Sequence, residues 1–283
     1  MLVSKLYGGI GNQLFQLWTA RKLSLDLDLP LGIDTSFFRN QKHVTERTYA
    51  LHEVVKQLEN CQELNRIQAI RNNLLNSIGY GSIIKESNSG LVPQVDNSEH
   101  LTLDGYWQNF RNFDSIKSEI KKKIQNINHS TFLERNMDGD VLAIHVRRGD
   151  YVTNYKARNF HGLLTAKYFQ IAEKRALENL AIKKIIVFSE DINWCEKNIK
   201  FKSNCEYFRQ DRNMSDFDVL RLLSRFKNQI ISNSSFSWWS AYLAYEENSF
   251  VCMPKIWNLK NQTIIENLRL PGWQTIEDSL DGY

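Results

Sequence analysis

The hydrophobic pattern in the second half of the chain is organised around one apolar run, Val141 to Val146. This run is interrupted only by one histidine, and it predicts a strand covered on both faces, as in a parallel sheet. Arg147-Arg148-Gly149-Asp150 follows it directly. Polar residues just past such a strand lie where open α/β sheets bind ligands, so this junction is the first candidate site.

Strand, polar loop and helix alternate after residue 140. Further strands are expected at Lys183–Ser189 and Gln229–Ser232, and helices at Thr165–Leu180, from near Asn193, from Asp216 to Phe226 and from Phe236 to Glu246. A polar loop is expected between Tyr151 and Gly162. This recurrence predicts a parallel α/β sheet, because parallel strands need long, usually helical, crossovers.

The first half of the chain begins with a similar unit. The expected elements are a strand at Leu2–Leu6, a glycine-rich loop at Gly8–Asn12, a helix at Gln13–Leu25, a helix over residues 61–78, a loop over 79–99, a strand at Leu101–Trp107 and a lysine-rich helix at Phe113–Ile127. A polar segment over residues 126–140 predicts the domain boundary, with domains at 1–138 and 139–283.

The glycine-rich loop follows a strand and precedes a helix, which is the setting of many phosphate-binding loops. Gly9 and Gly11 fit the dinucleotide fingerprint G-x-G-x-x-G, but Leu14 occupies its third glycine position. The loop also lacks the Lys-Ser/Thr pair of a P-loop. A Rossmann oxidoreductase is therefore disfavoured.

The composition of the chain indicates which class of ligand it binds and in which compartment it is found. The net charge of +4 suits an anionic small substrate and is too small to indicate nucleic acid. The four cysteines form no C-x-x-C pair, which is typical of reduced thiols. No signal peptide and no bilayer-spanning run are recognisable. We therefore expect a cytoplasmic protein with at most peripheral contact with the inner membrane.

Arg147 and Arg148 are the first candidates for ligand contacts. A guanidinium is planar, permanently charged and able to donate two parallel hydrogen bonds, which suits a phosphate or pyrophosphate. The alternative is a surface ion-pair cluster that includes Asp150. The ends of two other strands bear on this choice, because parallel strands place their carboxyl ends on one rim of the sheet.

Glu190-Asp191 and Ser234-Ser235 follow those two strands. A carboxylate can accept the N1–H and N2–H₂ donors of guanine, and the N–H groups at a helix start can bind a diphosphate. Each residue also has a structural alternative: Asp191 and the serines can cap helices, and His145 can be a hydrogen-bonded core histidine. Their convergence on one rim favours a purine diphosphate site.

Three D-x-D tripeptides could suggest a metal site: Asp26/Asp28, Asp138/Asp140 and Asp216/Asp218. The first follows a predicted helix, the second lies in a polar linker and the third starts a predicted helix. A metal-binding D-x-D is expected at the end of a strand instead. We therefore expect no metal and no other cofactor.

Several motifs carry a resemblance to a known family. They are Gly8-Gly9-Ile10-Gly11-Asn12-Gln13-Leu14-Phe15-Gln16, Asp104-Gly105-Tyr106-Trp107-Gln108, His145-Val146-Arg147-Arg148-Gly149-Asp150-Tyr151, Phe188-Ser189-Glu190-Asp191-Ile192-Asn193-Trp194, Ser232-Asn233-Ser234-Ser235-Phe236-Ser237-Trp238-Trp239 and Pro254-Lys255-Ile256-Trp257. They span nearly the whole chain in the expected order. The chain resembles the inverting α-1,2-fucosyltransferases of glycosyltransferase family 11, especially the bacterial members.

The resemblance implies a fold and a reaction. The fold is α/β and GT-B-like, with two facing Rossmann-type domains and a cleft between them. The C-terminal domain would bind GDP-fucose, and the N-terminal domain would lie mainly on the acceptor side. The reaction is metal-independent transfer of L-fucose to O2 of a terminal galactose, in an oligosaccharide or a lipid-linked glycan of bacterial surface polysaccharide.

The resemblance also implies roles for individual residues. Arg147 is expected to bind the β-phosphate with help from Arg148, and His145 and Asp191 to contact the guanosine end. Ser234-Ser235-Phe236 is expected to form the turn beside the phosphates.

From the N-terminal domain, Gly9, Gly11, Asn12 and Gln13 are expected to face the cleft. Asp150 is the candidate base, because it is the carboxylate nearest the arginines. The alternative is that Asp150 only orients an arginine. Two other functions stay open: a GDP-sugar transferase of different linkage, and a non-catalytic GDP-sugar-binding protein.

Overall fold

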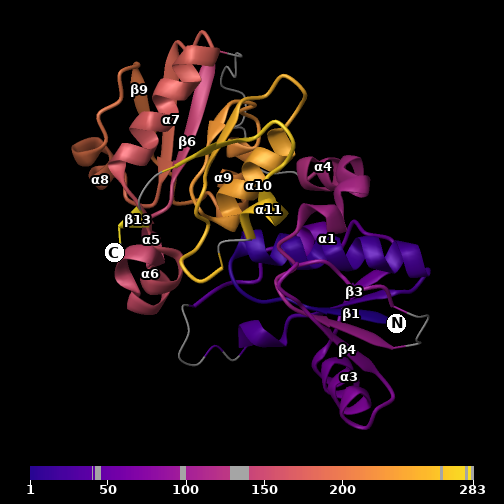
Figure 1. The fold of residues 1–283 in the computed structure, drawn as a ribbon. Helices are drawn as coiled ribbons and strands as arrows, with labels where there is room; N and C mark the ends of the chain where they lie inside the picture. The colour runs from indigo at the N-terminus through magenta and orange to yellow at the C-terminus, as the bar shows by residue number, and fades with distance from the viewer. Residues whose placement is uncertain are drawn as a thin grey trace. The chain divides into compact units, whose positions relative to one another are not determined.

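The computed structural model describes residues 1–39, 41, 46–95, 100–127, 140–261, 264–277 and 280–281. The chain divides into two compact units, Met1–Asn128 and His129–Tyr283. Each unit is built around its own parallel sheet, and Figure 1 shows the first unit in indigo to magenta and the second in pink to yellow. The prediction of an α/β protein with two Rossmann-type sheets is confirmed. The predicted boundary between residues 138 and 139 lies outside the described residues, and the cleft stays a prediction.

The C-terminal sheet has six parallel strands. They are β6 (Val141–Val146), β8 (Lys184–Ser189), β9 (Cys205–Phe208), β10 (Gln229–Ile230), β11 (Val251–Pro254) and β12 (Gln274–Ile276), in the order β12-β11-β10-β6-β8-β9. The chain moves from β6 outward to β9, and then returns to the other side of β6 at β10. Ligands of such sheets bind where the strand order reverses, outside the carboxyl ends of the two central strands.

β6 is apolar apart from His145 because helices cover both of its faces. Leu142, Ile144 and Val146 pack in one cluster with α7 (Ala166–Asn179) and α8 (Ile192–Asn198). Ala143 packs on the opposite face, in a cluster with α9 (Asp216–Leu223). The strand therefore lacks the polar alternation of a half-exposed strand, and its polar residues come only at its end.

The N-terminal sheet is also parallel and reverses its strand order. Its strands are β1 (Leu2–Lys5), β2 (Leu31–Asp34), β3 (Cys61–Glu63), β4 (Ser82–Lys85) and β5 (Leu101–Asp104), in the order β3-β2-β1-β5-β4. Its longer helices are α1 (Ile10–Leu27), α3 (Arg66–Ser77) and α4 (Lys117–Gln125). The reversal falls between β1 and β5.

Some predicted boundaries in this unit are wrong. α1 begins at Ile10 and not at Gln13, because Gly9 already has the extended conformation of an N-cap. The helix predicted over 61–78 contains the short strand β3, and the helix itself starts only after Asn65, which forms a capping box with Gln68. The predicted loop over 79–99 contains β4, an edge strand with one buried residue and hence a weak hydrophobic signal.

Three further boundaries differ. The predicted loop between Tyr151 and Gly162 contains α5 (Gly149–Thr153) and α6 (Tyr155–His161), and α6 is capped by the side chain of Asn154. Ser215, and not Asp216, caps α9. β5 ends at Asp104, three residues before its predicted end, because the chain turns there and Trp107 has a φ of 57°.

Candidate active site

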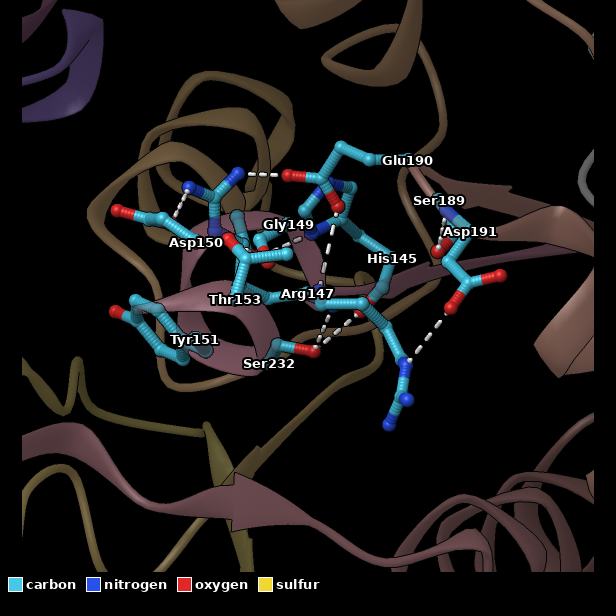
Figure 2. A network of polar contacts seen from close by, with 12 residues as sticks. His145, Arg147, Gly149, Asp150, Tyr151, Thr153, Ser189, Glu190, Asp191 and Ser232 are labelled. Atoms are coloured by element: carbon cyan, nitrogen blue, oxygen red, sulfur yellow. Dashed lines mark hydrogen bonds and ion pairs between the residues drawn. The ribbon is translucent and has the colours of Figure 1, made fainter. Parts of the chain in front are cut away.

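The backbone before Arg147 is joined to the neighbouring strand by the Ser232 hydroxyl. This hydroxyl donates to the carbonyl oxygen of His145 at 2.7 Å and accepts from the backbone N–H of Arg147 at 2.9 Å. Ser232 is 1% exposed and follows β10, so the two hydrogen bonds bridge β10 and β6 at the point of strand reversal (Figure 2). They hold in place the main chain from which the Arg147 side chain extends.

The Arg147 guanidinium lies between two carboxylates. It donates from Nη2 to Asp150 and from Nη1 to Glu190, as Figure 2 shows, and it lies 5.4 Å from the ring centroid of Tyr151. Gly149 has a φ of 31°, and a Cβ there would lie 3.2 Å from the Glu190 carboxylate. The predicted ion-pair cluster therefore exists. It also holds the guanidinium at the strand reversal, where a guanidinium can bind a phosphate.

The Arg148 side chain has different partners from its neighbour. Its Nε lies 3.3 Å from Oδ2 of Asp191, and its guanidinium carbon lies 3.9 Å from the ring centroid of Trp194. The other carboxylate oxygen of Asp191 accepts from the backbone N–H of Trp194 at 3.1 Å and so caps α8. The capping alternative for Asp191 is confirmed, and contact with guanosine stays a prediction. Arg148, Asp191 and Trp194 form a separate cluster with a charged and an aromatic face.

His145 is buried at the end of β6 with 5% of its surface exposed. Its Nδ1 lies 2.6 Å from the Ser237 hydroxyl, and its ring centroid is 5.0 Å from that of Phe236. Burial, and secondarily the charge of Arg147, lowers the pKa of His145 to about 3. The imidazole is therefore neutral near pH 7, and it links β6 to the start of α10 (Ser235–Ala244).

The start of α10 lies next to this junction. Ser234 is its N-cap residue, but among the described residues the Ser234 hydroxyl forms no capping hydrogen bond to the helix. Ser235 and Phe236 are the first two helical residues and are partly exposed. The N–H groups of a first helical turn favour an anion, so the predicted phosphate-side turn has a suitable geometry.

The four residues proposed for the N-terminal domain have different environments. Gly9 caps α1, and Gly11 is buried in its first turn. The Asn12 side chain accepts from Gln108 at 2.8 Å. The Gln13 side chain is fully buried and is engaged by main-chain groups: it donates to the carbonyl oxygens of Gly8 and Thr48 and accepts from the N–H of Ala50. Gln13 therefore holds two loops together.

Three contact residues of the site were not assigned a role from the sequence. Ser232 and Ser237 lie in the S-N-S-S-F-S motif, and Trp194 lies three residues after Asp191. Their positions within these motifs were the one feature of the sequence that could have indicated a role in the site. Their roles depend on which strand is the neighbour of β6, and that pairing cannot be read from local sequence.

The described part of the chain shows neither a metal-binding cluster nor a membrane-spanning helix. No group of three or more His, Cys, Asp or Glu side chains among these residues is arranged to hold a metal ion. In the same part of the chain, no helix has the length and apolarity needed to cross a membrane.

The fold and the site define a doubly wound α/β protein that presents an arginine and a helix start at its strand reversal, an arrangement suited to a nucleotide diphosphate. Residues 36–277 match the sequence model of Glycosyl transferase family 11. The chain therefore belongs to this family and is a glycosyltransferase.

Two relatives from Escherichia coli are similar along nearly their whole length. The O-antigen biosynthesis glycosyltransferase WbnK is 27% identical, with 96% of this chain and 99% of the relative covered. An alpha-1,2-colitosyltransferase is 29% identical, with 91% of this chain and 92% of the relative covered.

Two solved structures share less with the chain. The fucosyltransferase NodZ from Bradyrhizobium is 14% identical, with a TM-score of 0.45 and coverage of 84% of this chain and 91% of that one. POFUT1 in complex with GDP is 13% identical, with a TM-score of 0.47 and coverage of 89% and 97%.

Proposed function

We propose that this glycosyltransferase transfers L-fucose from GDP-fucose to O2 of a terminal galactose, with inversion and without a metal ion, in the synthesis of a bacterial surface polysaccharide such as an O-antigen. The observation that carries the proposal is the position of Arg147 at the strand reversal, within the H-x-R-R-G-D-Y motif of the fucosyltransferases the chain resembles. The name of the relative WbnK supports the O-antigen setting.

In the proposed reaction the bond from O2 of galactose to the fucose anomeric carbon forms while the bond from that carbon to the β-phosphate oxygen breaks. The electron pair of the broken bond leaves with GDP, so negative charge grows on the β-phosphate. Arg147 and the first turn of α10 stabilise this charge, and one well-placed donor of this kind contributes about 3–4 kcal/mol. Arg148, whose side chain contacts Asp191 and Trp194, assists Arg147 from the same rim of the sheet.

The O2 hydroxyl loses its proton as it attacks. Asp150 remains our candidate for the base, although its contact with Arg147 is also what a carboxylate that orients the guanidinium would make. An incoming diphosphate competes with both carboxylates for Arg147. Glu190 is the more readily displaced, because its side chain is 38% exposed and that of Asp150 is 13% exposed.

A second donor follows from the relatives. The alpha-1,2-colitosyltransferase is about as similar to this chain as WbnK is. Colitose is L-fucose without its 3-hydroxyl. One site can therefore accept either sugar unless a protein group forms a hydrogen bond with that hydroxyl. GDP-colitose is therefore the donor to compare directly with GDP-fucose.

The test is release of GDP from each donor in EDTA, with and without lactose as acceptor, followed by NMR of the product linkage. We expect lactose-dependent release from GDP-fucose and a fucose bound at O2 of galactose. Release that needs Mn²⁺ would contradict metal independence, and another linkage would contradict the acceptor position. Binding of GDP-fucose without turnover on any galactose-terminated acceptor would support the non-catalytic alternative.

A further inference from the structure

The D-G-Y-W-Q motif, residues 104–108, lies at the strand reversal of the N-terminal sheet. It follows β5, and Tyr7 follows the neighbouring strand β1. The rings of Tyr7 and Tyr106 meet edge to face, with centroids 4.9 Å apart. Tyr106 is 41% exposed and Tyr7 is half-buried. The reversal of a doubly wound sheet is where ligands bind, and here it presents two tyrosines to solvent.

The turn that carries Tyr106 is built to present that side chain. Glu86, just after β4, accepts from the N–H of Tyr106 at 2.7 Å and from the N–H of Gln108 at 3.2 Å. Gly105 permits this approach, because a Cβ there would lie 2.4 Å from the Cβ of Glu86. Trp107, with a φ of 57°, points inward and is fully buried. Of the two adjacent aromatic residues Tyr106 and Trp107, Tyr106 is the exposed one.

Polar and aromatic groups border the tyrosine pair. Asp104 accepts from Lys5 at 3.0 Å and from the Tyr7 hydroxyl at 3.5 Å. The ring of Phe37, in the short helix after β2, lies 5.9 Å from that of Tyr7. Two carboxylates, Asp104 and Glu86, thus lie beside partly exposed rings, and both are themselves partly exposed.

We propose that Tyr7, Tyr106, Asp104 and Glu86 form a saccharide-binding subsite for the acceptor glycan, an assignment that rests on the proposed function. The apolar C–H face of a pyranose packs against an aromatic ring, and sugar hydroxyls donate to carboxylate oxygens. A fully structural ring pair would be buried like Trp107, and the fold instead uses Glu86 and Gly105 to hold Tyr106 outside.

Charges of both signs border the subsite. Lys5 lies 3.0 Å from Asp104, and the positive charge of Arg47 acts on Tyr106, where it lowers the pKa against the larger, raising effect of burial.

The experiment measures lactose as acceptor with the full-length protein in three variants. Tyr106→Ala removes the ring, Tyr106→Phe keeps the ring without the hydroxyl, and Tyr80→Ala removes a tyrosine of the same unit that is 75% exposed. We expect Tyr106→Ala to raise the KM for lactose at least about tenfold, a factor equal to about 1.4 kcal/mol. The KM for GDP-fucose and the melting temperature should stay near wild type. Tyr80→Ala should keep the wild-type KM for lactose, and Tyr106→Phe should restore most of the lactose affinity that Tyr106→Ala loses, because it keeps the ring.

A lactose KM unchanged in Tyr106→Ala would overturn the subsite. If no donor is turned over at all, the proposed function fails separately, and saturation-transfer NMR with lactose still tests the subsite. Signal in the wild type that disappears in Tyr106→Ala would support it, and absence of lactose signal in the wild type would overturn it.

Discussion

The Ser232 hydroxyl donates to the carbonyl oxygen of His145, 2.7 Å away, and so joins the ends of two neighbouring parallel strands. The same hydroxyl accepts from the N–H of Arg147. One buried side chain thus fixes the main chain on both sides of Val146. The position of the guanidinium that we propose binds the phosphate is set by a serine on another strand as well as by its own strand.

We predict that Ser232→Ala lowers kcat by about 10-fold to 100-fold, because small displacements of a catalytic group are costly. It should also lower the free energy of unfolding by about 1–3 kcal/mol, because a buried N–H and a buried carbonyl lose their partner. Steady-state kinetics and urea unfolding check both effects.

Ser240→Ala is the matched control for that variant. Its hydroxyl is also buried and has two acceptors within hydrogen-bond distance, Oε1 of Gln229 at 2.8 Å and the carbonyl oxygen of Ser237 at 2.7 Å, but it does not contact the main chain of Arg147. We expect a similar loss of stability with little loss of kcat. Equal losses of kcat in the two variants would show that Ser232 acts only through stability.

Arg147→Lys tests whether shape as well as charge is required at the strand reversal. A lysine keeps the positive charge, but it cannot bridge Asp150 and Glu190 or donate a planar pair of hydrogen bonds to a phosphate. We expect kcat to fall about 100-fold with intact folding. Arg209→Ala, which removes an exposed arginine paired with Glu196, should leave kcat unchanged. An Arg147→Lys enzyme with wild-type kcat would contradict the phosphate assignment.

Asp191→Asn separates the two roles considered for this residue. Asparagine caps helices as well as aspartate does, so α8 should remain intact. The amide cannot accept two guanine donors as a carboxylate does, so we expect the Kd for GDP to rise at least about tenfold, or about 1.4 kcal/mol. Calorimetry measures the Kd of each variant for GDP and for ADP, which lacks the two guanine donors. Asp216→Asn on α9 is the control variant. An unchanged Kd for GDP would show that Asp191 caps α8 and does not bind guanine.

The sequence predicted β6 because both faces of that strand are covered, which gives a long apolar run followed by polar residues. Burial alone was not a sufficient signal: β2 and β11 are buried at every position, but each has only four residues and neither was predicted. β3 and β4 were missed because each is short and mostly not buried, and each pairs with a neighbour: β3 with β2 and β4 with β5. Such pairing depends on tertiary structure, which local propensity does not encode.

Within the site, residue types were predictable and partners were not. Two adjacent arginines indicated an anion site, but nothing local showed that Arg147 pairs with Asp150 and Glu190 while Arg148 pairs with Asp191. These partners come from the turn after β6 and from the end of the neighbouring strand β8, so the pairing depends on the fold. Gln13 was expected to face the cleft, and nothing local showed that its side chain is buried and hydrogen-bonded to the carbonyl oxygens of Gly8 and Thr48.

His145 makes the protein sensitive to acid. Burial and the charge of Arg147 lower its pKa to about 3 in the folded state, whereas an unfolded histidine titrates near about 6.5. The unfolded chain therefore binds a proton that the folded chain excludes, and stability falls as pH drops from about 6.5 toward 3. The expected contribution to the slope is up to about 1.4 kcal/mol per pH unit.

The variant His145→Asn isolates this contribution. Its side-chain amide can replace Nδ1 in the contact with Ser237 but does not titrate. Urea unfolding at several pH values between 4 and 7 should give a shallower loss of stability in the variant than in the wild type. Parallel pH profiles for wild type and His145→Asn would show that the imidazole of His145 is protonated in the folded protein as readily as in the unfolded chain.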